Sequence, residues 1–75
     1  MIIATSLKTE SGDDYLFLFK DITNPDEYVH AIENQMRDEL AYVYNHSIAI
    51  LDSSYEVQEM YSQFLQDRID EMGAY

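Results

Sequence analysis

Cysteine is absent from the chain, so a disulfide framework, a thiolate metal site and a cysteine nucleophile are all excluded. Glycine and proline are scarce, with two glycines and one proline, and the sequence has no glycine-rich phosphate-binding loop. No stretch approaches the roughly 20 apolar residues of a membrane span, and the N-terminus lacks the basic start and apolar run of a signal peptide. These absences predict a soluble protein of the cytoplasm.

Positive charge is the other scarcity. Four Lys and Arg stand against fifteen Asp and Glu, which leaves a net charge of -11 on 75 residues. Such self-repulsion destabilises a small fold, and a polyanion is repelled by nucleic acid and by anionic membranes. The composition therefore predicts no direct binding to nucleic acid or membrane. It favours a basic protein as partner, with solubility as the alternative reason for the charge.

The apolar content is high for so acidic a chain. Hydrophobic residues make up 47% of the sequence, and seven tyrosines and three phenylalanines are among them. A disordered acidic tail carries few aromatic residues. We therefore expect residues 1–75 to form one domain with a packed core, and a homodimer would add stability that so short a chain lacks.

The first twenty residues predict a β-hairpin over 1–20. A β-branched stretch is followed by a polar loop in which Gly12 is able to take a positive φ. The chain then returns as Tyr15–Phe19, five consecutive large apolar residues. One face of this strand meets the core. The other face is expected to be covered by a helix, by the C-terminus or by a second copy, with an exposed aromatic patch as the alternative.

A helix over about 25–44 is predicted next, because Asn24 is a good N-cap, Pro25 suits the first turn and Glu27 completes a capping box. Its expected buried stripe is Val29, Ile32, Met36, Leu40 and Val43, flanked by Tyr28. Because residues 42–44 also have strand propensity, an earlier end of the helix stays open. A short buried strand over about 47–51 follows.

The last helix is predicted over about 54–72, with Ser53 and Glu56 as a capping box and Gly73 as its end. Its apolar stripe is Val57, Met60, Tyr61, Phe64, Leu65 and Met72. Arg68 interrupts that stripe. Either it extends past the end of the core to solvent or pairs with an acid of the hairpin or the first helix, or it reaches across a dimer seam.

The order of these elements, ββαβα, indicates an α+β domain in which two helices pack on one face of a three-stranded, mostly antiparallel sheet. The third strand is expected to pair antiparallel with the first. The alternative is parallel pairing with the second strand through a right-handed crossover.

No residue pattern supports catalysis, a cofactor or a metal site. Glu27 and His30 match half of a di-iron carboxylate motif, but the second half is missing. The many carboxylates lie on solvated helix faces, where no burial raises their pKa values for acid catalysis. We therefore expect a protein that is not an enzyme.

The last helix carries the best functional clue. Glu56, Glu59, Asp67 and Asp70 follow one side of it over about 21 Å, at steps commensurate with phosphates along a nucleic-acid strand. We call these four residues the acidic row, and Gln63 occupies the gap in it. A solvated helix face is the alternative interpretation. The predicted partner-binding residues are Tyr55, Glu56, Glu59, Gln63, Asp67, Asp70 and Glu71.

In size, acidity and this row, the chain resembles small phage-encoded acidic inhibitors of the anti-CRISPR and anti-restriction type that mimic nucleic acid. The resemblance is one of character and not of motif. It implies electrostatic and steric blockade of a basic partner with a nucleic-acid-binding surface, such as a CRISPR effector or a nuclease, in the cytoplasm of a host cell. A nuclease immunity protein or an antitoxin shares these features.

A second hypothesis is a small homo-oligomeric interaction or assembly module. It would bind through its aromatic strand and its tyrosines and not through its acids. Its interface residues are Tyr15, Phe17, Phe19 and Arg68.

Overall fold

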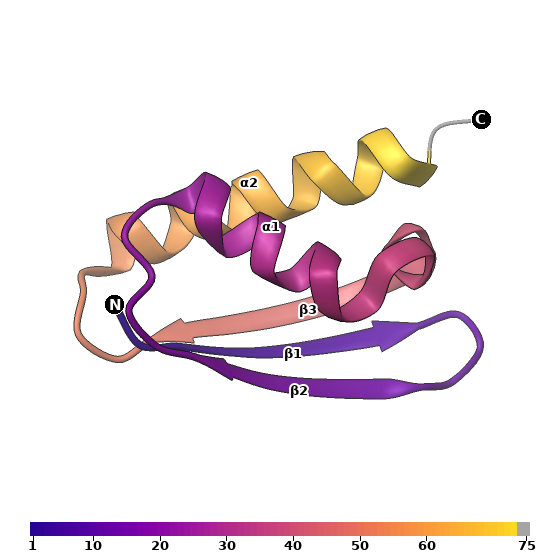
Figure 1. Cartoon of the computed structure of the whole chain (residues 1–75), viewed down its shortest axis with the longest axis horizontal. Helices are drawn as coiled ribbons and strands as arrows, with labels where there is room; N and C mark the ends of the chain where they lie inside the picture. The colour runs from indigo at the N-terminus through magenta and orange to yellow at the C-terminus, as the bar shows by residue number, and fades with distance from the viewer. Residues whose placement is uncertain (74–75) are drawn as a thin grey trace.

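The computed structural model describes residues 1–73, which form a sheet covered by helices on one side (Figure 1). The elements are β1 (Ile3–Thr9), β2 (Asp14–Phe19), α1 (Pro25–Met36), the 3-10 helix η1 (Arg37–Tyr42), β3 (Val43–Ile50) and α2 (Tyr55–Gly73). The strand order is β2-β1-β3, and both neighbours of β1 are antiparallel to it. The predicted α+β class, the ββαβα order and the antiparallel pairing of the third strand with the first are confirmed.

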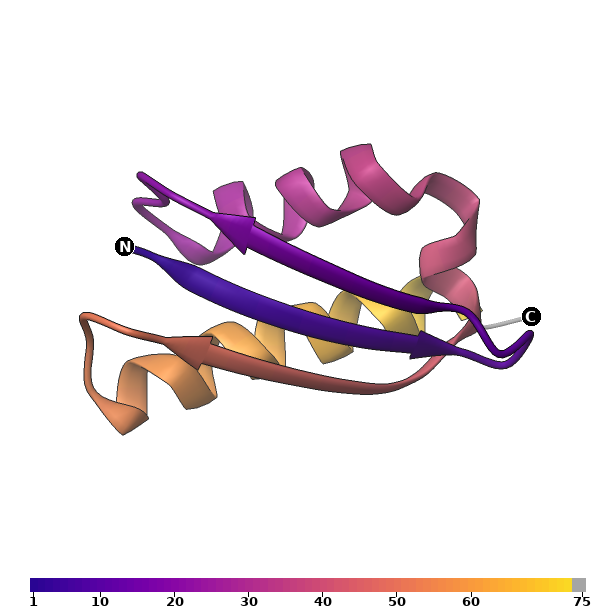
Figure 2. The same cartoon turned by 90° about the horizontal axis from the view of Figure 1, so that it is seen from below.

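The two faces of the sheet differ completely in their surroundings. Both helices lie over one face (Figure 1), and a view from the sheet side shows the three strands in front with α1 and α2 behind them (Figure 2). Side chains alternate along β1 between these faces: Ile3, Thr5 and Leu7 are buried toward the helices, whereas Ala4 and Ser6 point to the open side and are half-buried.

The hairpin between β1 and β2 turns at Gly12. Its φ of 92° lies in the left-handed region that favours glycine, and its N–H donates to the carbonyl of Thr9 at 3.0 Å. The turn sets a register in which Ile3 faces Phe19, Thr5 faces Phe17 and Leu7 faces Tyr15.

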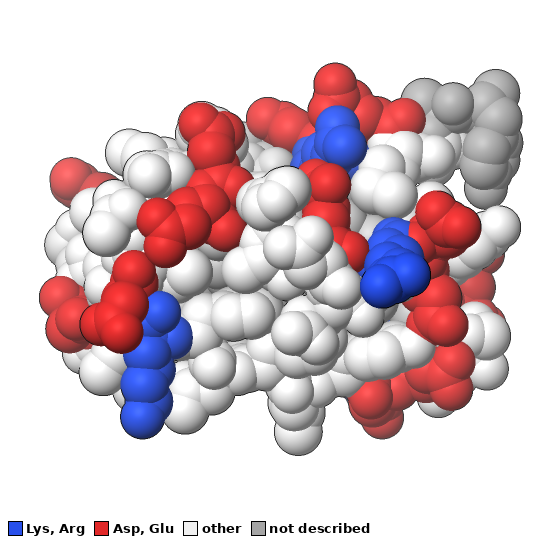
Figure 3. Space-filling view, viewed as in Figure 1, with Lys and Arg blue, Asp and Glu red and all other residues white. Residues whose placement is uncertain are grey.

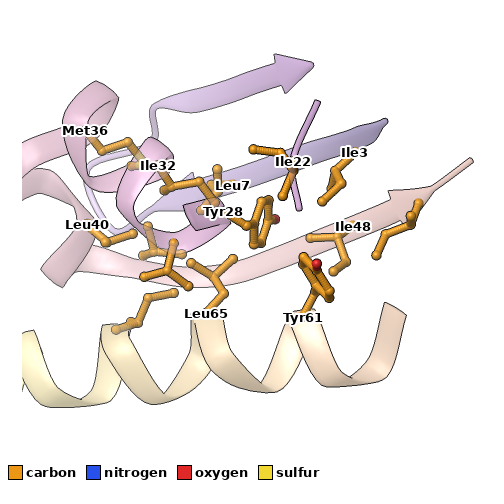
Figure 4. Packing of buried hydrophobic residues seen from close by; sticks show 14 residues of the cluster. Ile3, Leu7, Ile22, Tyr28, Ile32, Met36, Leu40, Ile48, Tyr61 and Leu65 are labelled. Carbon is orange, nitrogen blue, oxygen red and sulfur yellow. The ribbon is translucent and has the colours of Figure 1, made fainter. Parts of the chain in front are cut away.

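The core lies between the sheet and the helices, and every helix and β1 and β3 contribute to it (Figure 4). Tyr28 of α1 and Tyr61 of α2 meet near its middle, with ring centroids 5.7 Å apart. The hydroxyl of Tyr28 and Oγ1 of Thr5 lie 2.7 Å apart in a buried hydrogen bond that ties α1 to β1. Burial raises the pKa of Tyr28 to about 12, although the Thr5 hydrogen bond opposes this shift.

The first helix is shorter than predicted. It ends at Met36, because Arg37 takes a φ of 52° and its N–H caps the helix on the carbonyl of Glu33. The prediction of a helix to about residue 44 is therefore wrong, whereas the strand predicted over about 47–51 is present but begins earlier, at Val43, and ends at Ile50. Leu40 and Val43 are buried as expected, but they belong to η1 and β3, because a tighter helical turn followed by a strand keeps the same two residues facing the core.

The helix starts agree with their signals in part. Asn24 caps α1, and its Oδ1 accepts from the Glu27 N–H at 2.8 Å. The carboxylate of Glu27 accepts from the hydroxyl of Thr23 at 2.7 Å. In a capping box it would instead accept from the N–H of Asn24. In α2 the expected capping residue Ser53 is replaced by Ser54, whose Oγ accepts from the Val57 N–H at 3.4 Å.

Candidate partner-binding surface

The acidic row lies on the solvent side of α2. Its four members are all exposed, whereas Leu65 and Ile69 on the opposite side of the same helix are buried. From Glu56 to Asp70 the helix rises by 14 steps of about 1.5 Å, so the row extends about 21 Å. Figure 3 shows acidic side chains over the helical side of the molecule and also at both of its ends.

Cations do not neutralise the row. Among residues 1–73, the ion pairs are the two that Arg68 makes, with Glu33 and with Glu71. No Lys or Arg therefore pairs with a member of the row, although Glu71 beside it is paired. Within residues 1–73, no ion pair compensates the charge of these four carboxylates.

Glutamine side chains hold two carboxylates of the row. Gln63 Nε2 donates to Asp67 Oδ1 at 2.8 Å, and Gln66 Nε2 donates to Asp70 Oδ1 at 2.9 Å, each across one helical turn. Gln66 Oε1 also lies 2.9 Å from His46 Nε2, which links this turn of α2 to β3. Asp67 and Asp70 are thereby restricted in orientation before any partner arrives, and a smaller ordering cost favours binding.

An aromatic ring lies next to the N-terminal end of the acidic row. Tyr55 is 71% exposed at the start of α2, and the neighbouring Glu59 carboxylate raises the pKa of its phenol above the usual range. Tyrosine is enriched at protein interfaces, because its rigid ring loses little entropy on binding.

Met60 and Phe64 correct the predicted apolar stripe of α2. They were expected to be buried, yet they are 50% and 42% exposed, while Ile69 takes a place in the core that the prediction did not give it. The contact of α2 with the sheet is narrower than the full width of its apolar residues. Two large apolar side chains therefore lie at the solvent surface, close to the acidic row.

A shallow groove runs between α1 and α2. Its lining residues are Asp26, Val29, His30, Glu33, Phe64, Asp67, Arg68 and Glu71. The floor is partly apolar and four of the eight lining residues are acids, so the groove extends the acidic row toward α1.

Arg68 lines this groove and pairs with two of its acids, Glu33 and Glu71. Its Nε donates to Glu33 Oε1 at 2.5 Å, its second nitrogen donates to Glu33 Oε2 at 3.3 Å, and Nη1 donates to Glu71 at 3.3 Å. Hydrogen bonding to Glu33 raises the pKa of the Arg68 guanidinium above its usual range. Of the predicted roles, the structure shows the pairing with an acid of the first helix. The guanidinium is thus engaged within its own chain.

The aromatic residues of β2 face the helices. Tyr15, Phe17 and Phe19 are half-buried and form a row of neighbouring rings, and Phe19 meets Tyr28 edge-on at 6.0 Å. Tyr15 also donates a hydrogen bond to Glu39. The side chains that point to solvent are instead Leu16 and Leu18, which are 80% and 59% exposed. Sequence reasoning placed the aromatic residues at the alternative interface and missed these leucines.

Other site classes find little support in the described part of the chain. No group of three or more His, Asp or Glu residues within 1–73 is placed to hold a metal ion. None of the described helices is long and apolar enough to cross a membrane.

Comparisons with protein-family models, with curated proteins and with solved structures gave no match to this chain.

Proposed function

We propose that the protein is a non-catalytic inhibitor that binds the basic, nucleic-acid-binding surface of another protein through its acidic row. The partner class is a protein that handles DNA or RNA, such as a CRISPR effector or a nuclease. Occupation of its basic groove would exclude the nucleic acid by charge and by bulk.

One observation carries the proposal: the acidic row is exposed, spans about 21 Å of a single rigid helix and is not neutralised by a cation of the described residues. Surface acids that serve only solubility need no such alignment, and carboxylates along one side of a helix can enter a basic groove that binds phosphates. A helix also holds its side chains in fixed relative positions, which a loop does not.

The exposed apolar residues beside the row add a contact that phosphates lack. Met60 and Phe64 can insert between the aliphatic parts of Lys and Arg side chains, whose charged ends reach the carboxylates. Tyr55 extends this surface at the start of α2. Charge then supplies association rate and orientation, and the apolar residues supply residence time.

The test uses the heparin-binding fraction of a bacterial lysate, which is enriched in basic nucleic-acid-binding proteins. The immobilised protein is compared with the double variant Glu59→Lys/Asp67→Lys and with the control Glu10→Lys/Asp38→Lys. Both variants change two exposed acids, so each has a net charge of -7 instead of -11. Captured proteins are identified by mass spectrometry and eluted with salt.

We expect the control to capture the same protein as the wild type and the row variant to lose it. The captured protein should elute at moderate salt, because exposed charges are screened within about 10 Å at 0.1 M, and double-stranded DNA or RNA should displace it. Equal loss in both variants would show that net charge alone is responsible. Salt-resistant capture that nucleic acid does not displace would overturn the proposal.

A further inference from the structure

The open side of the sheet is a second surface with a different character. Its central side chains are uncharged: Ala4, Ser6, Leu16, Leu18, Ser47 and Ala49. We call these six residues the outer sheet face. The nearest row of the sheet toward the hairpin carries one charge of each sign, in Lys8 and its cross-strand neighbour Asp14. On a chain with a net charge of -11, a surface without acids is the exception, and the centre of the lower edge in Figure 3 is white.

This face has relief as well as composition. Leu16 and Leu18 stand up along the edge strand β2 as a leucine ridge, 80% and 59% exposed. On β1 and β3 the paired positions are Ala4 with Ala49 and Ser6 with Ser47, so the rest of the face is a trough of small side chains. Ridge and trough together enclose a shallow hollow on the sheet.

The ridge and the trough are complementary to each other under two-fold symmetry. An axis parallel to the strands, between two sheets stacked face to face, sets β2 of one copy opposite β3 of the other. Stacked sheets lie about 10 Å apart, a gap that Ser and Ala alone leave empty and that an opposing Leu fills. Leu16 and Leu18 of each copy would then pack on Ser47 and Ala49 of its partner.

Charge selects the same face. Two copies that approach with their helical layers bring two acidic rows together and repel each other. Two copies that approach with their outer sheet faces meet without opposed acids, and Lys8 of each lies near Asp14 of the other at one end. A second copy is therefore the occupant that this face fits.

We propose that the outer sheet face is a homodimer interface in which the leucine ridge of each copy fills the small-residue trough of the other. Three strands about 4.8 Å apart and six paired positions about 3.4 Å apart give a face of roughly 300 Å² on each copy. The total area is below that of standard specific interfaces, so the dimer is expected to be weak and to form only between micromolar and millimolar protein. The proposal does not depend on the function proposed above, because it uses the opposite face.

Sedimentation velocity from micromolar to millimolar protein tests it. The wild type should shift from monomer to dimer over this range, and added salt should favour the dimer, because it screens the repulsion between two acidic chains. Leu16→Thr/Leu18→Thr, which keeps strand propensity, should remain monomeric. Met60→Ala, which removes a half-exposed apolar side chain from the helical layer, should dimerise as the wild type does.

A complementary pair of variants tests the symmetry. Ala49→Glu and Leu18→Lys should each dimerise at least tenfold more weakly than the wild type. An equimolar mixture of the two should form a heterodimer, because the introduced carboxylate and the introduced ammonium group meet only across an axis parallel to the strands. Circular dichroism at micromolar concentration checks that each variant folds. A wild type that stays monomeric at millimolar concentration, a dimer that survives the leucine changes, or a mixture without heterodimer would overturn the proposal.

Discussion

The helical layer and the outer sheet face are two surfaces of one small domain with opposite chemistry. The helical layer carries the acidic row with Met60 and Phe64 beside it, whereas the outer sheet face carries leucines and small side chains without central charge. One core separates them. The negative charge of this chain is therefore distributed unevenly over its surface. One face suits contact with a basic partner, and the other suits contact between uncharged surfaces.

Salt should move the two contacts in opposite directions. Binding of a basic partner by the acidic row weakens as salt screens the attraction, and association of two copies through the sheet strengthens as salt screens the repulsion. A single salt series on both measurements therefore separates the two surfaces without any mutation.

The greatest change in the free energy of unfolding is expected at a core leucine, in contrast to a leucine of the outer sheet face. Leu65→Ala should lower the free energy of unfolding by about 3 kcal/mol, because Leu65 is fully buried in the core and its loss leaves a cavity. Leu18→Ala should change it by less than about 0.5 kcal/mol in the monomer, since Leu18 is 59% exposed. Urea denaturation at micromolar protein measures both. A large loss for Leu18 would mean that the outer sheet face is already covered.

The next effect concerns the burial of the Tyr28 phenol in the core, which raises its pKa. The pKa of Tyr28 is about 12 in the folded protein against about 10 when unfolded. Burial of the neutral phenol therefore contributes fully to the free energy of unfolding below pH 10, and this contribution is lost as pH rises through 12. A rise in pKa from about 10 to about 12 corresponds to a full loss of about 3 kcal/mol, most of which is reached by pH 12. Urea denaturation between pH 9 and about 12 should show this fall.

A matched pair of substitutions isolates that contribution. Tyr28→Phe combined with Thr5→Val removes both hydrogen-bonding partners, which leaves no unpaired buried hydroxyl. The double variant should have a flatter stability profile above pH 10. A profile as steep as that of the wild type would assign the alkaline loss to other groups, such as Tyr61, whose pKa burial also raises.

A smaller change in stability is expected at the ion pair between Arg68 of α2 and Glu33 of α1. Arg68→Met should reduce stability only slightly, because the Arg68 side chain is 42% exposed and solvent screens its ion pair with Glu33. Thermal denaturation at low and high salt measures the change, and the difference from the wild type should shrink with salt. If the variant alters dimerisation at the sheet, Arg68 has a role beyond its own chain.

The smallest effect is expected at the gap in the acidic row. Gln63→Glu places like charges one turn from Glu59 and Asp67 and removes the hydrogen bond to Asp67, which should cost a few tenths of a kcal/mol. Binding of the basic partner should tighten at low salt, as titration calorimetry can measure, while the dimer is unaffected. Gln35→Glu, at an exposed position of α1, controls for net charge.

The sequence predicted the elements that have strong local signals. The alternation of Ile3, Thr5 and Leu7 and the Asn24 cap of α1 are local patterns, and the structure contains both. The end of α1 was mispredicted, because Leu40 and Val43 suit a helix or a turn followed by a strand equally well. No glycine marks the break at Arg37, so the decision comes from tertiary packing.

The candidate site was predictable in its charges and not in its apolar parts. The acidic row is where helical periodicity placed it, on the exposed side of α2. How wide a stripe the core covers depends on neighbouring elements, so Met60 and Phe64 could not be placed from α2 alone. Five consecutive apolar residues in β2 likewise do not indicate which ones face inward, and the partner of Arg68 lies 35 positions away.

The central position of β1 has a consequence for the rate of folding. Its partner β2 follows after a short turn, but its other partner β3 is paired from residue 50 back to residue 3, across the whole of α1 and η1. The entropy of closing so long a loop is lost before most of the β1–β3 contacts form. Non-local pairing of this kind therefore slows folding. We expect the hairpin to form early and to wait, with its unpaired edge and leucines exposed, until β3 arrives.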